Sequence, residues 1–223
     1  ASGTDGNLIT YDASGNPAAV ATGDDGQVLT SAGAGAAPAF EAASGGGLIR
    51  LATNTLSGAV SSSNFDDTYV TTTYNTYMLT WNGITGDTDG YDLVINLSDD
   101  NGSTFQANKC GHTYHSLTWA GAPLQQAYTA GARVMSDGES DDSDGRCGGT
   151  AWLSLSNSAT GSGYSYINSL CTKGAAGGAS TGYGYHVFTM FYDLNRPNYI
   201  RFEDSEGNNL DTGEFVLYGL ARA

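Results

Sequence analysis

The chain has 223 residues and carries 23 acidic against 8 basic residues, a net charge of −15. This balance argues against binding to nucleic acid or to an anionic membrane surface, because both need clustered Lys and Arg to neutralise phosphates. The apolar runs fall short of the ~18–20 residues that a membrane-spanning helix needs. The chain has 32 Gly and 14 Tyr, with Ser, Thr, Asn and Asp between short apolar runs, a mixture that favours strands and tight turns over helices.

Residues 1–47 form a repetitive segment that is rich in Ala, Gly, Ser and Thr. The run Asp-Gly-Asn-Leu-Ile-Thr at 5–10 recurs twenty residues later as Asp-Gly-Gln-Val-Leu-Thr at 25–30, and each run is followed by a proline and then by an apolar residue, Val20 or Phe40. A unit of this size cannot bury a core alone, so such repeats gain one by stacking or by packing against other chains. We therefore expect a stalk, ended by a Gly-rich linker, in which identical chains pool five apolar side chains: Leu8, Ile9, Val28, Leu29 and Phe40. A disordered tail is the alternative, since Gly- and Ala-rich tracts often lack a fixed structure.

Residues 48–223 carry short apolar runs separated by turn residues. Side chains alternate at 77–81 and again at 91–98, which predicts half-buried strands with a period of two. Asn101-Gly102 follows, and this dipeptide predicts a hairpin whose return strand covers 103–109. Further strands are expected from the runs at 152–156, 164–170, 185–192, 199–203 and 214–220. About nine or ten short strands without a convincing helix indicate an all-β head, an antiparallel β-sandwich with a jelly-roll-like order.

Motifs at both ends of the chain resemble those of bacteriophage tail-fibre proteins, in their distal, receptor-binding part. The stretches that carry the resemblance are 3–11, 26–31 and 38–40 in the stalk, and 77–79, 97–105 and 213–220 in the head. The resemblance implies a homotrimeric protein of the virion surface, assembled in the host cytoplasm. Its N-terminal region would contact other virion proteins, and its tip would attach to a host cell-surface glycan or protein. The alternative is a structural capsid-decoration, head-fibre or collar protein that binds no receptor.

The middle of the head, about 110–185, has no counterpart in that resemblance, and receptor-binding loops are expected there. It is rich in aromatic side chains among Gly, Ser and Thr, which is the composition of recognition surfaces. The candidate receptor-binding residues are Tyr114, Trp119, Tyr128, Tyr164, Tyr183 and Tyr185. For any single residue the alternative is core packing, and alternating rings such as Tyr164 and Tyr166 fit a sandwich interior equally well.

An acidic segment at 136–145 is the first candidate metal site. Its carboxylates are Asp137, Glu139, Asp141, Asp142 and Asp144. Hard oxygen ligands on a flexible loop suit Ca²⁺, and a solvated surface loop is the alternative. The pattern Cys110-x-His112-x-x-His115 holds softer ligands, but on one strand His115 points away from the other two. A three-fold axis could repeat one His into a zinc or iron site, against the alternative of ordinary strand residues.

The sequence contains none of the common catalytic motifs. It lacks a Gly-x-Ser-x-Gly elbow, a phosphate-binding loop, a His-Glu-x-x-His pair and a Cys-x-x-Cys pair. We therefore expect a protein that is not an enzyme and requires no cofactor. A glycan depolymerase built on paired carboxylates is the enzymatic alternative. The three cysteines, Cys110, Cys147 and Cys171, allow one disulfide and a thiol or three buried thiols.

Overall fold

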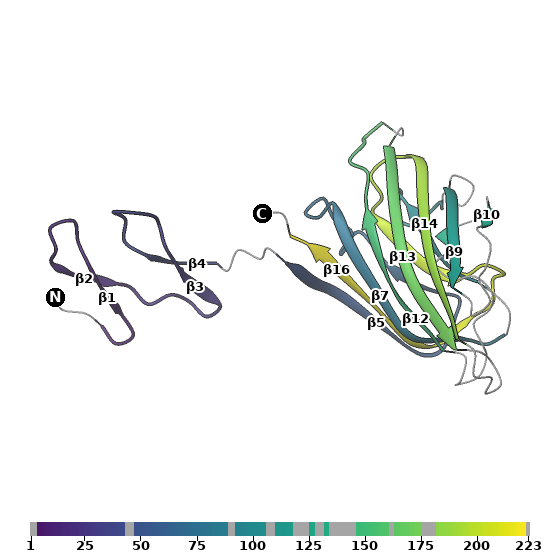
Figure 1. Ribbon diagram of the computed structural model, residues 1–223, viewed down its shortest axis with the longest axis horizontal. Helices are drawn as coiled ribbons and strands as arrows, with labels where there is room; N and C mark the ends of the chain where they lie inside the picture. The colour runs from purple at the N-terminus through teal and green to yellow at the C-terminus, as the bar shows by residue number, and fades with distance from the viewer. Residues whose placement is uncertain are drawn as a thin grey trace. The chain divides into compact units, whose positions relative to one another are not determined.

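The computed structural model describes most of the chain, namely residues 4–42, 47–88, 92–105, 110–117, 125–127, 132–133, 146–160, 163–174 and 182–221. Every regular element in these residues is a β-strand, and every pair of neighbouring strands is antiparallel (Figure 1). The expected all-β class is therefore confirmed. Within the same residues no helix could cross a membrane. The chain forms two units, a first up to Gly46 and a second from Gly47 to Arg222.

The first unit consists of two short hairpins, one for each sequence repeat. Strand β1 (Leu8–Tyr11) pairs with β2 (Pro17–Val20), and β3 (Gln27–Thr30) pairs with β4 (Ala39–Ala42). Gly15 and Gly35 shape the two hairpin loops with nearly equal φ angles of 80° and 81°. This left-handed conformation strains any residue with a Cβ, which is why the repeat places Gly at both positions.

The second hairpin contains one residue more than the first. Leu8 pairs with Val20 in the first hairpin, whereas the equivalent Val28 pairs with Glu41 in the second. The first strands of the repeats are thus offset by twenty residues and the second strands by twenty-one. Phe40 does not occupy the position of Val20, as the sequence repeat suggests, because a shift of one residue along a strand moves a side chain to the opposite face.

The second unit contains two antiparallel sheets (Figure 1). The larger has eight strands in the order β10-β9-β14-β13-β12-β7-β16-β5, and the smaller has four in the order β11-β8-β15-β6. The strands are β5 (Leu48–Val60), β6 (Ser62–Phe65), β7 (Thr76–Gly86), β8 (Leu93–Ser98), β9 (Cys110–Leu117), β10 (Gln125–Ala127), β11 (Ala132–Arg133), β12 (Cys147–Ser154), β13 (Gly163–Gly174), β14 (Gly182–Leu194), β15 (Tyr199–Asp204) and β16 (Leu210–Leu220).

One apolar core lies between the two sheets. The alternation expected at 77–81 is confirmed, because Tyr77, Leu79 and Trp81 of β7 are buried and the residues between them are only half-buried. Across the core, the ring of Phe202 lies 6.0 Å from that of Trp81 and 4.3 Å from that of Phe215 on β16, measured between ring centroids. Side chains from both sheets therefore interlock, and the larger sheet turns one of its faces to this core.

Two expectations for the region around β8 are wrong. All six residues of β8 are buried, so the strand is covered on both faces and is not half-buried. The Asn101-Gly102 turn exists, with φ angles of 57° and 81°. Residues 103–105 are not in a strand, residues 106–109 lie outside the described residues, and the described partners of β8 are β15 and β11. The dipeptide therefore ends β8 with a turn and does not form a two-residue hairpin.

Candidate binding face

Of the predicted receptor-binding residues, Tyr164 alone has a described side chain that is exposed. Tyr185 is 3% exposed and packs in the core, so it cannot contact a receptor in this fold and is removed from the candidates. Tyr114 lies on β9 and Tyr183 near the start of β14, and at both positions the structure describes the backbone alone. Trp119, Tyr128 and the acidic residues 137–144 lie outside the described residues.

Strand β13 presents its large side chains outward and its small ones inward. Tyr164 and Tyr166 are 53% and 40% exposed, whereas Ser165 and Ser169 between and beside them are at most 1% exposed. Ile167 on the inward face belongs to the core. The alternative in which Tyr164 and Tyr166 pack the sandwich interior is therefore wrong. Their rings lie on the face of the larger sheet that is turned away from the core.

The neighbouring strands follow the same alternation and extend this surface, which we call the outer face. It comprises the side chains of β7, β12, β13 and β14 that point away from the core: Met78, Thr80, Thr150, Trp152, Ser154, Tyr164, Tyr166, Asn168, Leu170, Thr172, His186, Phe188 and Met190. None of these residues is Asp, Glu, Lys or Arg. Aromatic and apolar side chains thus predominate on these four strands, and the charged residues on the same face of the sheet, Arg50 and Glu214, lie beyond them on β5 and β16.

Strand register places the largest side chains of the outer face in one row. Trp152 lies opposite Met78 on one side and opposite Asn168 on the other, and Asn168 lies opposite Phe188. Because neighbouring strands are ~4.8 Å apart, the backbones that carry Trp152 and Phe188 are about 10 Å from each other, with Asn168 between them. Both aromatic side chains are exposed. The row therefore presents two rings that flank an amide.

The polar groups of the row are held in a defined arrangement. His186 Nε2 lies 2.7 Å from Asn168 Oδ1, so the imidazole donates through Nε2 to the amide oxygen. The Asn168 amide nitrogen can then donate and His186 Nδ1 can accept. Beside this pair, the rings of Tyr166 and Phe188 are stacked with centroids 6.1 Å apart and planes 27° apart. Ring faces beside neutral donors and acceptors suit an uncharged ligand that has both apolar and hydroxyl surface.

Sequence analysis did not single out Trp152, Leu170, Asn168, His186 or Phe188. The runs at 152–156, 164–170 and 185–192 were expected as strands, and the strands are present. The alternate positions Ser-Ile-Ser-Cys of 165–171 face the core, but both sets of positions contain apolar residues, so the sequence pattern alone does not show which set is buried.

The predicted metal and stalk residues have different outcomes. No group of three or more His, Cys, Asp or Glu that could hold a metal ion occurs within the described part of the chain. The pattern of Cys110, His112 and His115 lies on β9, whose backbone alone is described. Cys147 and Cys171 are buried in the core.

The predicted core residues of the stalk are mostly exposed in the single chain. Phe40 is half-buried, and the other four are exposed: Leu8, Ile9, Val28 and Leu29.

Comparison with known proteins gives no relative: no protein-family model, no curated protein and no solved structure matches the chain. The chemistry of the outer face and of the hairpins therefore carries the functional argument.

Proposed function

We propose that this chain is a non-enzymatic fibre protein of a virion surface, and that its head attaches to a host cell through the outer face. The observation that carries the proposal is the row Trp152, Asn168, Phe188, in which two exposed rings flank a hydrogen-bonded amide. Exposed apolar patches of this extent mark interaction sites. Aromatic residues are also the commonest anchors of binding energy at such sites.

The ligand that this surface fits best is an uncharged glycan of the host cell surface. Aromatic rings stack on the apolar faces of sugar rings, and the amide, imidazole and hydroxyl groups around them can bond to sugar hydroxyls. None of the residues that make up the outer face is acidic, so a neutral ligand meets no carboxylate among these side chains. A charged polysaccharide finds no opposite charge among them, since Arg50 and Glu214 lie on β5 and β16.

The fibre is a homotrimer held together by its first unit. Strands of four residues joined as isolated two-stranded hairpins are marginal in water, since two strands cannot enclose a core. Large apolar side chains of both hairpins, such as Ile9 and Leu29, are exposed in the single chain. Three copies that share these side chains would bury them, and three outer faces on one fibre would hold a cell firmly even where each site is weak.

The head is a jelly-roll-like sandwich in this proposal. Its two sheets share one core, and its first strand, β5, lies beside its last strand, β16. Pairing of the first strand with the last fits a jelly-roll-like head, and the outer face lies on strands of the larger sheet instead of on loops.

The test compares adhesion of the full-length protein to host cells and to an array of neutral and anionic polysaccharides. Trp152→Ala and Phe188→Ala should each weaken binding to cells and to neutral glycans by about tenfold or more, as expected for a truncated hot-spot ring. Tyr69→Ala is the matched control, because Tyr69 is an exposed aromatic residue in the turn after β6 and does not belong to the outer face.

Two results would contradict the proposal. Wild-type protein that adheres to no host cell, while virions without the head adsorb normally, would leave a structural decoration, head-fibre or collar role. Equal loss of adhesion in the Tyr69 variant and in the outer-face variants would show that binding does not depend on this surface. Release of reducing ends from a host polysaccharide would instead indicate a depolymerase.

A further inference from the structure

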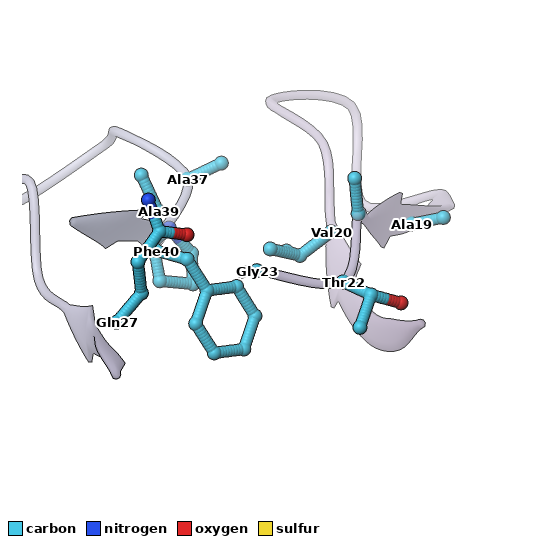
Figure 2. A pocket seen from close by; sticks show the side chains of 10 residues that line it. Ala19, Val20, Thr22, Gly23, Gln27, Ala37, Ala39 and Phe40 are labelled. Atoms are coloured by element: carbon cyan, nitrogen blue, oxygen red, sulfur yellow. The ribbon is translucent and has the colours of Figure 1, made fainter. Parts of the chain in front are cut away.

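The first unit contains a groove between its two hairpins (Figure 2). The groove has a volume of about 350 Å³. It is formed by the end of β2, the segment from there to the start of β3, the end of the loop between β3 and β4, and the start of β4. The residues that line it are Ala19, Val20, Ala21, Thr22, Gly23, Gln27, Ala37, Pro38, Ala39 and Phe40. No residue of this lining is charged, although the unit contains five carboxylates and neither Lys nor Arg at positions 4–42.

Close packing of Phe40 on Gly23 fixes the shape of the groove. A Cβ at Gly23 would lie 2.6 Å from Phe40 Cγ, so only glycine lets the ring approach the segment between the hairpins. Figure 2 shows Val20 and Phe40, one from each hairpin, on either side of Gly23. Val20 is buried, and the rest of the lining consists of Ala, Pro and Gly together with the uncharged polar side chains of Thr22 and Gln27. The groove is therefore uncharged and mainly apolar.

The same unit carries large apolar side chains that project into solvent. Ile9 and Tyr11 alternate along β1 and so lie on one face of the first hairpin, and they are 78% and 69% exposed. These are the most exposed large apolar side chains of the described chain. One chain thus presents both a mainly apolar groove and a pair of exposed apolar side chains.

We propose that the groove is occupied by a second copy of this chain, with Ile9 and Tyr11 of one copy seated in the groove of the next. Such a contact joins two different surfaces, and contacts of this head-to-tail kind close into rings when the rotation allows it. The uncharged lining lets two acidic units meet without bringing carboxylates together. This inference rests on the proposed trimer and names the contact that builds it.

The experiment measures the oligomeric state of the full-length protein by sedimentation over a range of concentrations. Ile9→Ser should raise the dissociation constant of the oligomer at least ~10-fold, the effect of removing one buried apolar side chain. Ala39→Trp should do the same by filling the groove from the other side of the contact. Ala13→Trp, in the exposed loop of the first hairpin, is the matched control and should leave the oligomer unchanged.

A second measurement guards against a variant that merely fails to fold. Chains with Ile9→Cys are mixed with differently tagged chains with Ala39→Cys, and mild oxidation should join the two tags by a disulfide. Chains with Ala13→Cys in place of Ile9→Cys should not join. An oligomer that forms normally with Ile9→Ser and Ala39→Trp, and no cross-link between the tags, would overturn the groove contact while the trimer stands. A wild-type monomer at every concentration would overturn the trimer itself.

Discussion

Asp100 organises the turn that ends β8. Its carboxylate accepts hydrogen bonds from the Ser98 hydroxyl and the Thr104 hydroxyl, both at 2.6 Å, and from the Thr104 backbone N–H at 2.8 Å. These donors favour the ionised carboxylate, with Ser98 making the largest contribution, and they lower the pKa of Asp100 from 3.8 to about 2. Because the pKa is lower in the folded chain, the turn stabilises the fold above the unfolded pKa and loses this contribution as pH falls through about 2.

Asp100→Asn should therefore destabilise the head at neutral pH and have little effect in strong acid. An amide cannot accept the same charge-assisted bonds. The difference in unfolding free energy between wild type and variant should stay constant down to about pH 5 and shrink between about pH 4 and pH 2. Urea unfolding across this pH range measures it. Asp67→Asn, at an exposed loop position, provides the control. A difference that does not change with pH would show that the carboxylate charge is not what holds the turn.

At the scale of the element, the backbone of β12 lies very close to side chains of the core. A Cβ at Gly149 would lie 2.4 Å from Trp81 Cζ2 and 2.7 Å from Cys171 Cβ, so the indole ring packs directly on the strand. The pairing of β12 with β7 is irregular at this point, between Cys147 and Gly149. At the adjacent Gly148 the nearest atom is 3.4 Å away, an ordinary contact. Packing against Trp81 therefore requires glycine at position 149, whereas a Cβ at position 148 would make an ordinary contact.

Gly149→Ala should lower the unfolding free energy of the head by about 1–3 kcal/mol, the usual cost of overpacking a core. The indole ring of Trp81 would have to move, and the fluorescence of Trp81 should report the shift. Gly148→Ala is the neighbouring control and should change stability by less than about 1 kcal/mol. Equal destabilisation by both substitutions would mean that backbone flexibility, and not the contact with Trp81, explains the glycines.

At the scale of the whole molecule, charge opposes assembly. Each copy carries a net charge of −15, and the first unit contributes carboxylates without any basic residue at positions 4–42. Copies that come together therefore repel one another unless salt screens them. The apolar contacts proposed for the stalk have to overcome this repulsion, so ionic strength should act on assembly more than on the fold of the head.

Assembly should accordingly become stronger as salt is added. The Debye length falls from ~30 Å at 0.01 M to ~8 Å at 0.15 M, which removes most repulsion between exposed charges. Sedimentation at these two salt concentrations should show more oligomer at the higher one, while the melting temperature of a head without residues 1–46 changes less. Oligomers that dissociate on addition of salt would point to ion pairs between copies as the holding force.

The sequence predicts the class of the fold better than the orientation of its strands. Alternation at 77–81 predicts β7 correctly because Tyr77, Leu79 and Trp81 are all large and mainly apolar, whereas the positions between them include the polar Thr80. In β13 both parities carry apolar side chains, and the pattern alone cannot tell which one faces the core. The smaller sheet covers small side chains such as Ser165 and leaves Tyr164 outside, which is a property of the packed layers. The outer face was therefore visible in the structure and not in the sequence, except for Tyr164 and Tyr166.

The position of β16 has a consequence for how the protein is made. This strand lies inside the larger sheet, between β7 and β5, and its pairs with β5 are separated by 150 or more positions of sequence. A ribosome must therefore synthesise the chain through Leu220 before β5 gains its neighbour, and contacts so distant in sequence slow folding. Until then β5 leaves a thirteen-residue edge open to other nascent chains. Chains that end before β16 lack its pairing with β5 and β7, so we expect proteases to degrade them faster than complete heads.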